Sequence, residues 1–279
     1  MRSQTARQVF SLTLQVGEFV LQLRCEDALA WHQLAERYGP FRVSTTSSPH
    51  LVADLVIERP AAARPAQEPV LSFRAGHLVL EGPGVAGWVA ADERRGHLTL
   101  NTPYVAEQAE YFLRAACALV AFEAGGLLLH AAGVVHRGRT YLFFGHSGSG
   151  KTTVAGFARL GDRLLNDDLV VLSPHDDRWT AWATPFSSPP GAFNLGPCSA
   201  PVAALFRLVP SSVVRADPLD PAQAVAELVA NAPVVSADPG RSVALLERCA
   251  ALARQVPLYA LHFRRDPSFW EVVDKAVHG

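Results

Sequence analysis

The chain has 279 residues, which is enough for one large domain or two smaller ones with a substantial apolar core. Hydrophobic residues make up 49% of it and charged residues 18%, so we expect a folded globular protein rather than a disordered one. The formal net charge of -1 gives no electrostatic footprint for nucleic acid or an anionic membrane, and we expect neither as a partner.

Four cysteines are scattered through the chain, at Cys25, Cys117, Cys198 and Cys249. They form no C-x-x-C pair and have no histidines at matching spacing, which argues against a zinc site and against a disulfide scaffold in a chain of this size. No stretch of about 18 apolar residues occurs, and the first residues lack the pattern of a secretory signal. We therefore expect reduced, buried thiols and a cytoplasmic protein.

The N-terminal part carries strand patterns. Residues 8–24 partly alternate apolar and polar positions around Gly17, which predicts a hairpin. The proline-rich stretch 59–69 has no core pattern and predicts an exposed loop. Further strands are predicted over residues 50–59, 70–82 and 97–101.

The pattern then changes to the period of a helix. Thr102 can cap this helix, Pro103 suits its first turn, and Gly125 is placed to end it. We expect the domain boundary here, with a β-rich N-terminal domain over residues 1–125 that ends in the helix and a second domain over residues 126–279.

The second part alternates strand and helix patterns, which predicts an α/β domain. An aspartate followed by proline is a matched helix start, because the aspartate caps and the proline fits the first turn. Three helices are therefore expected to start at Asp220, Asp238 and Asp266. Strands are predicted over residues 127–135, 140–145, 169–173 and 258–263, and a helix over residues 151–160.

Residues 145–152 satisfy the pattern G-x-x-x-x-G-K-[ST] of a phosphate-binding loop, after an apolar strand and at the start of a helix. Glycines let backbone N–H groups converge on phosphate oxygens, and the helix N-terminus adds a partial positive charge. Lys151 would reach the β- and γ-phosphates, and the Thr152 hydroxyl would hold Mg²⁺. Only Lys151 and Lys275 are lysines among 25 basic residues, which argues against an accidental match. The expected nucleotide-binding residues are Gly145, His146, Ser147, Gly148, Ser149, Gly150, Lys151, Thr152 and Thr153.

Asp167 and Asp168 follow the phosphate-loop helix and precede an apolar run. Two adjacent carboxylates offer one group to a metal ion and one to accept a hydroxyl proton, the two tasks that phosphoryl transfer requires. A strand cap or a solvated turn is the alternative interpretation. His130 lies on the strand expected beside the phosphate-loop strand and could face the γ-phosphate, although a lone histidine beside a core strand is often a satisfied structural group.

Signatures of two other nucleotide-binding classes are missing. The sequence after the loop contains no N-K-x-D segment of the kind that reads the base in GTPases. It also contains no L-S-G-G-Q-type segment of transporter ATPases. Both absences favour phosphate transfer over a nucleotide switch or a transport motor.

The order of His130, the loop "GHSGSGKTT" and the segment "LGDRLLNDD" resembles the HPr kinase/phosphorylase and phosphoenolpyruvate carboxykinase superfamily. The similarity lies in the upstream histidine, the SGxGKT form and a short helix ending in R-L-x-x-D-D, and it is clear over residues 126–175. The resemblance implies an α/β P-loop kinase domain of the HPr kinase/phosphoenolpyruvate carboxykinase type. Such a domain has a mixed sheet and flanking helices, and here the β-rich N-terminal part would precede it.

The same resemblance implies ATP and Mg²⁺ as cofactors. Thr152 and one of the two aspartates would hold the metal ion, and the other aspartate would act as base toward the acceptor hydroxyl. Asp168 is our candidate metal ligand, but the residues leave the division of roles open. His130 would assist at the transferred phosphate or the metal, so the implied catalytic residues are His130, Lys151, Asp167 and Asp168.

Two departures from the family put HPr as acceptor, and the reverse phosphorylase activity, in doubt. Thr153 stands where HPr kinase has an acidic residue after G-K-[ST], and residues 184–197 take the place of an E-I-R-G-x-G-type segment. The chain is similar in its overall look to HPr-kinase-like proteins of bacterial peptide-modification clusters. In that group the acceptor is a serine of a ribosomally made peptide, lasso peptides being one example.

The leading hypothesis is therefore an ATP- and Mg²⁺-dependent kinase that acts on a hydroxyl, a serine of a peptide or protein. A nucleotide-binding regulatory protein without transfer activity is the second hypothesis, and the aspartate pair disfavours it because a pure binder needs no proton acceptor. A small-molecule kinase of the same fold is the third. The sequence also leaves an oligomer possible.

Overall fold

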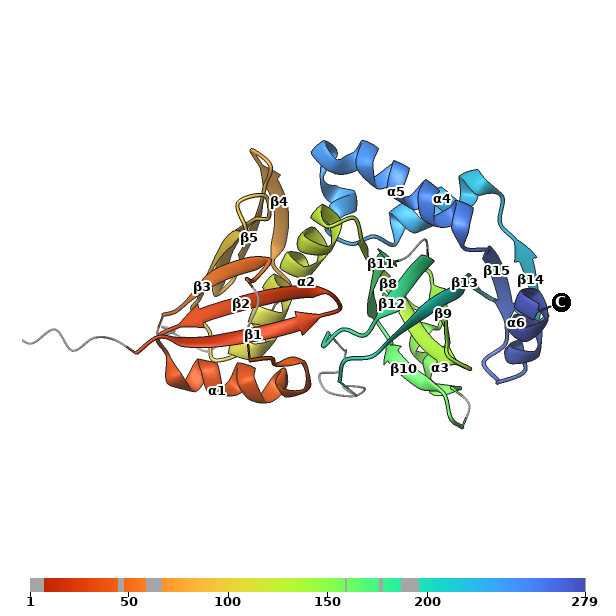
Figure 1. The fold of residues 1–279 in the computed structure, drawn as a ribbon, viewed down its shortest axis with the longest axis horizontal. Helices are drawn as coiled ribbons and strands as arrows, with labels where there is room; N and C mark the ends of the chain where they lie inside the picture. The colour runs from red at the N-terminus through yellow and green to blue at the C-terminus, as the bar shows by residue number, and fades with distance from the viewer. Residues whose placement is uncertain are drawn as a thin grey trace, which may run out of the picture. The chain divides into compact units, whose positions relative to one another are not determined.

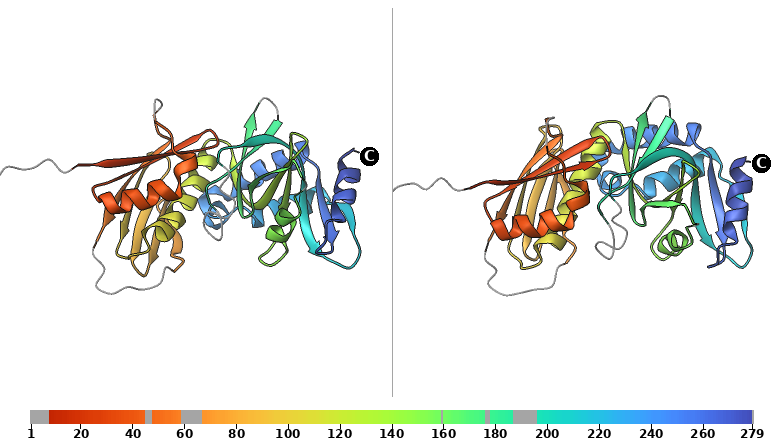
Figure 2. Two further views of the ribbon diagram at one scale, coloured as in Figure 1. Left: turned by 90° about the horizontal axis from the view of Figure 1, so that it is seen from below. Right: turned by 60° about the horizontal axis from the view of Figure 1, so that its bottom comes forward.

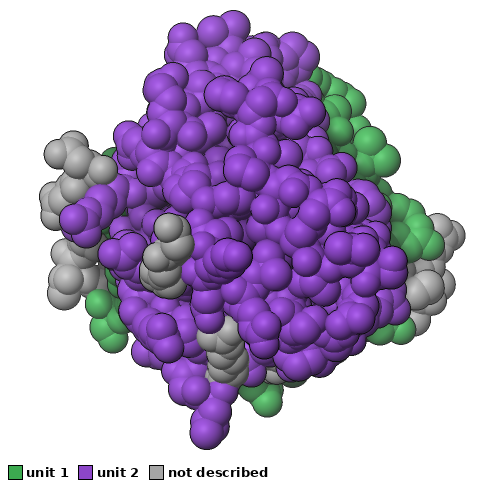
Figure 3. All heavy atoms as spheres, turned by 90° about the vertical axis from the view of Figure 1, so that its right-hand side faces the viewer, with its two compact units in different colours: residues 1–120 green, residues 121–279 purple. Residues whose placement is uncertain are grey.

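The structure is a computed structural model, and it describes residues 8–44, 48–58, 67–158, 160–175, 178–186 and 196–278. It divides into two compact units, Met1–Val120 and Ala121–Gly279 (Figure 3). This division falls inside the helix at which we expected the domain boundary, a few residues before the expected position. Most of the expected loop at 59–69 and of the segment 184–197 lies outside the described residues.

The first unit contains a seven-stranded sheet in the order β1-β2-β3-β7-β6-β5-β4 (Figure 1). The predicted hairpin is confirmed, because β1 and β2 pair antiparallel around Gly17, whose φ of 63° suits a tight turn. In β3 the residues Leu51, Ala53 and Leu55 are buried and Asp54 is exposed, so one face of the sheet carries the core. The strands are β1 (Phe10–Val16), β2 (Phe19–Cys25), β3 (Leu51–Ile57), β4 (Val70–Arg74), β5 (His77–Gly82), β6 (Val85–Ala90) and β7 (Arg95–Leu100).

Two helices, α1 (Ala28–Arg37) and α2 (Val105–Glu123), lie against one face of this sheet (Figure 2). A short 3-10 helix, η1 (Gly39–Phe41), follows α1. The α2 helix begins later than expected, because the Thr102 hydroxyl accepts a hydrogen bond from Tyr104 N in a turn before the helix. Its expected end is confirmed, since Gly125 has a φ of 91°.

The second unit contains eight connected strands that form a mixed sheet with helices beside it (Figure 1). Strand β8 (Leu127–His136) is antiparallel to β9 (Arg139–Phe144), as expected for the neighbour of the phosphate-loop strand. Strands β9, β13 (Ser199–Pro210) and β15 (Leu258–Phe263) run parallel to one another. Their carboxyl ends therefore lie at the same edge of the sheet.

The expected simple alternation of strands and helices is wrong between α3 (Lys151–Gly156) and α4 (Pro221–Ala230), where strands follow one another. The helix after the phosphate loop has only six residues, and the segment "RLLN" that we expected to end it is the strand β10. The proline- and alanine-rich β13 does not alternate apolar and polar residues, because its central residues are buried on both faces of the sheet. The strands between these helices are β10 (Arg163–Asn166), β11 (Leu169–His175), β12 (Arg178–Trp182), β13 and β14 (Arg215–Pro218).

The Asp-Pro helix start is confirmed for α4, whereas the two later helices begin a few residues after their Asp-Pro pairs. Asp220 accepts hydrogen bonds from Ala222 N and Gln223 N at the start of α4. Asp238 caps the 3-10 helix η3 (Pro239–Arg241), which leads into α5 (Ser242–Gln255), and another 3-10 helix, η2 (Val235–Ala237), precedes it. Asp266 accepts from Ser268 N just before α6 (Phe269–His278).

Aromatic side chains from strands and helices of the second unit form much of its core. Phe143 on β9 stacks on Phe206 of β13, and its ring also meets Phe269 and Trp270 of α6 edge-on. This packing fixes β9, and with it the start of the phosphate loop, against the rest of the sheet. Among the described residues, no helix combines the length and the apolar character needed to cross a membrane.

Candidate functional site

The phosphate loop connects β9 to α3 and requires its glycines. Gly145, Gly148 and Gly150 have φ values of 145°, 78° and 108°, a region that L side chains rarely adopt. At Gly150 space is also lacking, since a Cβ would lie 2.6 Å from Cζ of Phe263. The helix α3 has only six residues where we expected residues 151–160, and its N-terminus follows Gly150 at the end of the loop.

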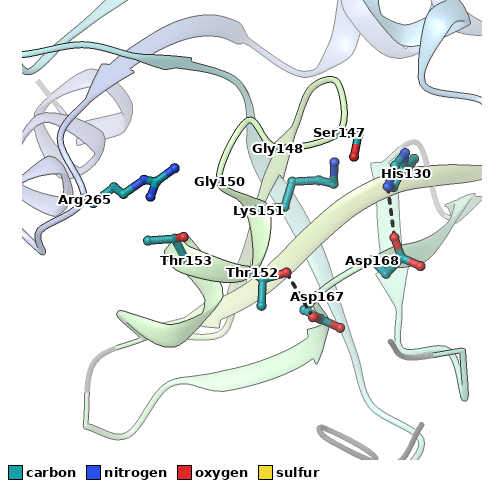
Figure 4. A pocket seen from close by; sticks show the side chains of 10 residues that line it. All are labelled: His130, Ser147, Gly148, Gly150, Lys151, Thr152, Thr153, Asp167, Asp168 and Arg265. Atoms are coloured by element: carbon teal, nitrogen blue, oxygen red, sulfur yellow. Dashed lines mark hydrogen bonds and ion pairs between the residues drawn. The ribbon is translucent and has the colours of Figure 1, made fainter. Parts of the chain in front are cut away.

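The Lys151 side chain folds back over this loop. Its Nζ donates to Gly145 O at 2.9 Å and lies 3.4 Å from His146 O. Burial lowers the pKa of Lys151, and the charge of Asp168 partly offsets that effect. The amino group is thus held above the loop, where a phosphate could replace the two carbonyl contacts (Figure 4).

Thr152 contacts the first of the paired aspartates. Its Oγ1 donates to Asp167 Oδ2 at 3.3 Å, and Asp167 is almost fully buried. A hydroxyl and a carboxylate side by side are hard oxygen ligands of the kind that Mg²⁺ prefers. Mg²⁺ is usually bound through one or two carboxylates plus phosphate oxygens and water, so this pair fits the ion even though the described residues contain no cluster of three or more metal-ligating side chains.

Asp168 contacts a different group. Its Oδ1 lies 2.9 Å from Nε2 of His130, and dashed lines in Figure 4 mark both this contact and the one between Thr152 and Asp167. The pairing of Leu169 on β11 with His130 on β8 brings the two side chains together. His130 is about one-third exposed, at 36% of its side chain, and it lines the same cavity as Asp168.

Asn166, which sequence reasoning missed, holds the aspartate pair in place. Its side-chain amide donates to Thr184 O at 3.1 Å and to Phe186 O at 2.9 Å. Its Oδ1 accepts from Asp168 N at 2.7 Å and from Leu169 N at 2.9 Å. One buried side chain therefore ties the turn that carries both aspartates to the segment after β12.

These groups meet in one cavity of about 390 Å³. Of the expected nucleotide-binding residues, Gly145, His146 and Ser149 do not line it, and His146 Nδ1 instead lies 2.7 Å from Ser147 O. Arg265 lines the cavity and was not expected. The signal that could have found it is its place directly after a strand parallel to the phosphate-loop strand. The lining residues are His130, Ser147, Gly148, Gly150, Lys151, Thr152, Thr153, Asp167, Asp168 and Arg265.

A family model described as "SynChlorMet cassette protein ScmC" matches residues 113–278. The chain belongs to the ScmC family. The match includes every residue that lines the cavity, so the site of this ScmC-family chain lies within the part that the family shares.

The similarity of the ScmC-family chain to other known proteins is weaker. No curated protein matches it. A solved structure, the Hpr(Ser) kinase/phosphatase from Coxiella burnetii, is similar at 12% sequence identity with a TM-score of 0.30, covering 53% of this chain and 95% of that chain. At this TM-score the likeness does not identify a shared fold.

Proposed function

We propose that this chain is an ATP- and Mg²⁺-dependent P-loop kinase of the HPr kinase-like type, which transfers the γ-phosphate to a serine hydroxyl of a peptide or protein in the cytoplasm. The observation that carries the proposal is the separation of the two aspartates within one cavity. Asp167 contacts Thr152 and Asp168 contacts His130, and both pairs lie beside Lys151 of the phosphate loop. Two carboxylates in different surroundings are suited to two different tasks.

The sequence left the roles of the two aspartates open and named Asp168 as a candidate metal ligand; the observed contacts support the other assignment. Because Thr152 is the hydroxyl expected at the metal ion, the neighbouring Asp167 is the better second ligand, and Asp168 becomes the candidate base. A bound Mg²⁺ would supply charge neutralisation at the phosphate oxygens. Asp167 would therefore hold the metal ion in position, and Asp168 would accept the hydroxyl proton.

In the proposed transfer, the acceptor hydroxyl oxygen forms a bond to the γ-phosphorus while the bond from that phosphorus to the β,γ-bridging oxygen breaks. The hydroxyl proton passes to the Asp168 carboxylate, and His130, 2.9 Å away, orients that carboxylate. Lys151 stabilises negative charge on the phosphate oxygens by exchanging its contacts with loop carbonyls for contacts with phosphate.

The family description suggests which molecules to test first as the phosphate acceptor. A cassette protein is described by its membership in a group of genes, so the products of that group are the first acceptors to test. Serine-containing peptides from such genes are the proposed partners. A regulatory nucleotide-binding protein and a small-molecule kinase remain as outcomes of the test.

The experiment is incubation of the chain with Mg²⁺, γ-labelled ATP and peptides encoded beside its gene, followed by mass spectrometry of the products. We expect a phosphorylated serine in one peptide. The Lys151→Ala variant should lose ATP binding, and unchanged affinity would remove the basis for the phosphate-loop assignment. Tight ATP binding with no labelled product would favour the regulatory protein, and label in a small metabolite would favour the third hypothesis.

A further inference from the structure

The cavity contains a cation that does not belong to the phosphate loop. Arg265 follows β15 by two residues, and β15 is parallel to β13, which is parallel to β9. The loops after β9 and β15 therefore leave the sheet at the same edge. This topology brings Arg265 beside a loop that lies more than a hundred residues earlier in the sequence.

Residues on both sides of Arg265 are anchored. The buried Phe263 ring packs on Gly150 so closely that a Cβ at that glycine would lie 2.6 Å from the ring. Asp266 accepts a hydrogen bond from Ser268 N at 3.0 Å, at the start of α6. The backbone that carries Arg265 is therefore held at a fixed place relative to the phosphate loop.

The two neighbouring arginines differ in their partners. Arg264 Nε lies 3.1 Å from Asp266 Oδ2, so its charge already has a carboxylate. No group among the described residues accepts a hydrogen bond from the exposed Arg265 guanidinium, or pairs with it. A guanidinium at the wall of a phosphate cavity without an acidic partner is available to an anionic ligand.

Figure 4 shows at which end of the cavity Arg265 lies. It stands on the side of Thr153, across the loop from His130 and Asp168. The contacts of Thr152 with Asp167 and of His130 with Asp168 mark the opposite end. If the transferred phosphate lies at that acidic end, the cation at the other end faces the phosphates that are not transferred.

We propose that Arg265 binds the non-transferred phosphates of the nucleotide and so fixes the direction in which the phosphate chain enters the loop. The inference rests on the proposed function, because it takes the nucleotide to be the ligand of the cavity. The planar guanidinium can donate two parallel hydrogen bonds to phosphate oxygens. Loss of such charge-assisted bonds weakens binding by about tenfold to a hundredfold.

The test is equilibrium binding of ATP, ADP and tripolyphosphate, each with Mg²⁺, to the full chain and to two variants. Arg265→Ala should weaken binding of all three ligands by a similar factor, about tenfold or more. Arg264→Ala is the matched control and should change each affinity by less than about twofold, because that arginine already pairs with Asp266. Arg265→Lys should retain part of the affinity that Arg265→Ala loses, since lysine keeps the charge but cannot donate two parallel hydrogen bonds.

The three ligands separate the possible contacts. Weaker binding of ATP with unchanged binding of ADP would mean that Arg265 meets the transferred phosphate, and this would overturn the inference. Weaker binding of both nucleotides but not of tripolyphosphate would mean a contact with the nucleoside and would overturn it as well. If the wild-type chain binds the ligands and Arg265→Ala binds them equally well, only this inference fails. If the wild-type chain binds none of them, the proposed function fails and the inference falls with it.

Discussion

Thr152 Oγ1 at the start of α3 donates a hydrogen bond to Asp167 Oδ2 over 3.3 Å, and Asp167 lies in the turn between β10 and β11. The adjacent Asp168 turns instead to His130, at 2.9 Å. Neighbours in the sequence thus have different surroundings, one beside the hydroxyl expected at a metal ion and one beside an imidazole. The two carboxylates should therefore respond differently to the same substitution.

We predict that Asp167→Asn raises the Mg²⁺ concentration needed for half-maximal transfer by about tenfold or more, because a neutral amide is a weaker ligand than a carboxylate. Asp168→Asn should leave the binding of ATP with Mg²⁺ nearly unchanged and lower the transfer rate by about a hundredfold to ten-thousandfold, the usual contribution of a general base. Transfer rates measured over a Mg²⁺ series, with binding measured separately, distinguish the two. A changed Mg²⁺ requirement in the Asp168 variant alone would reverse the assignment.

Asn166 gives a second prediction, on stability and rate together. Its replacement by alanine leaves two buried carbonyls and two backbone amides without this partner, so we expect a loss of unfolding free energy on the order of 2–4 kcal/mol. Transfer should fall more than ATP binding does, because the turn that carries Asp168 is no longer held. The melting temperature, the affinity for ATP and the transfer rate of the variant and the wild type are the measurements.

Two further substitutions control for that result. Asn166→Asp keeps an acceptor for the amides of Asp168 and Leu169 but loses the donors to Thr184 O and Phe186 O. Thr184→Val removes one hydrogen bond, to Leu169 O, and should cost less, about 1 kcal/mol. An alanine variant at position 166 with wild-type melting and wild-type transfer would show that the turn holds without this side chain.

The parts of the structure that sequence reasoning predicted well are those fixed by local chemistry. The hairpin around Gly17, the end of α2 at Gly125 and the cap of α4 by Asp220 all depend on residues a few positions apart. The glycines of the phosphate loop belong to the same class, because their positive φ values are a property of the backbone at each position. Such features need no knowledge of what packs against them.

Features that depend on distant partners were missed. We did not predict β6, because its sequence includes Gly87, a residue typical of turns. The structure requires glycine there, since a Cβ at Gly87 would lie 2.6 Å from His97 O on the neighbouring strand. The division of roles between the two aspartates was open for a related reason, since it depends on contacts with Thr152 and His130. Asn166 is held by a segment that begins about eighteen residues later, at Thr184. Arg265 reaches the cavity because β15 is parallel to β13. The pattern of a single sequence shows neither relationship.

His50 gives a prediction about the first unit and pH. Its Nδ1 accepts a hydrogen bond from Val20 N at 3.0 Å, and burial lowers its pKa, with the charge of Arg94 adding to the effect. Because the folded state disfavours the protonated ring, the unfolded chain takes up the proton first as the pH falls. Stability should thus be fully present above the ordinary histidine pKa and decline between about pH 7 and pH 5. Melting temperatures of the wild type and His50→Gln over this range test it, and an equal decline in both would contradict it.

Gly150 and Gly148 allow backbone strain to be separated from steric conflict in the phosphate loop. Both have positive φ, 108° and 78°, but a Cβ at Gly148 would meet nothing within 4 Å, while one at Gly150 would lie 2.6 Å from Phe263. Gly148→Ala should therefore cost only the strain, about 1 kcal/mol. Gly150→Ala should cost about 1–3 kcal/mol more and weaken ATP binding, because the loop must move away from the ring. The double variant Gly150→Ala with Phe263→Leu isolates the conflict: if relief of the ring contact restores none of the lost affinity, steric conflict is not its cause.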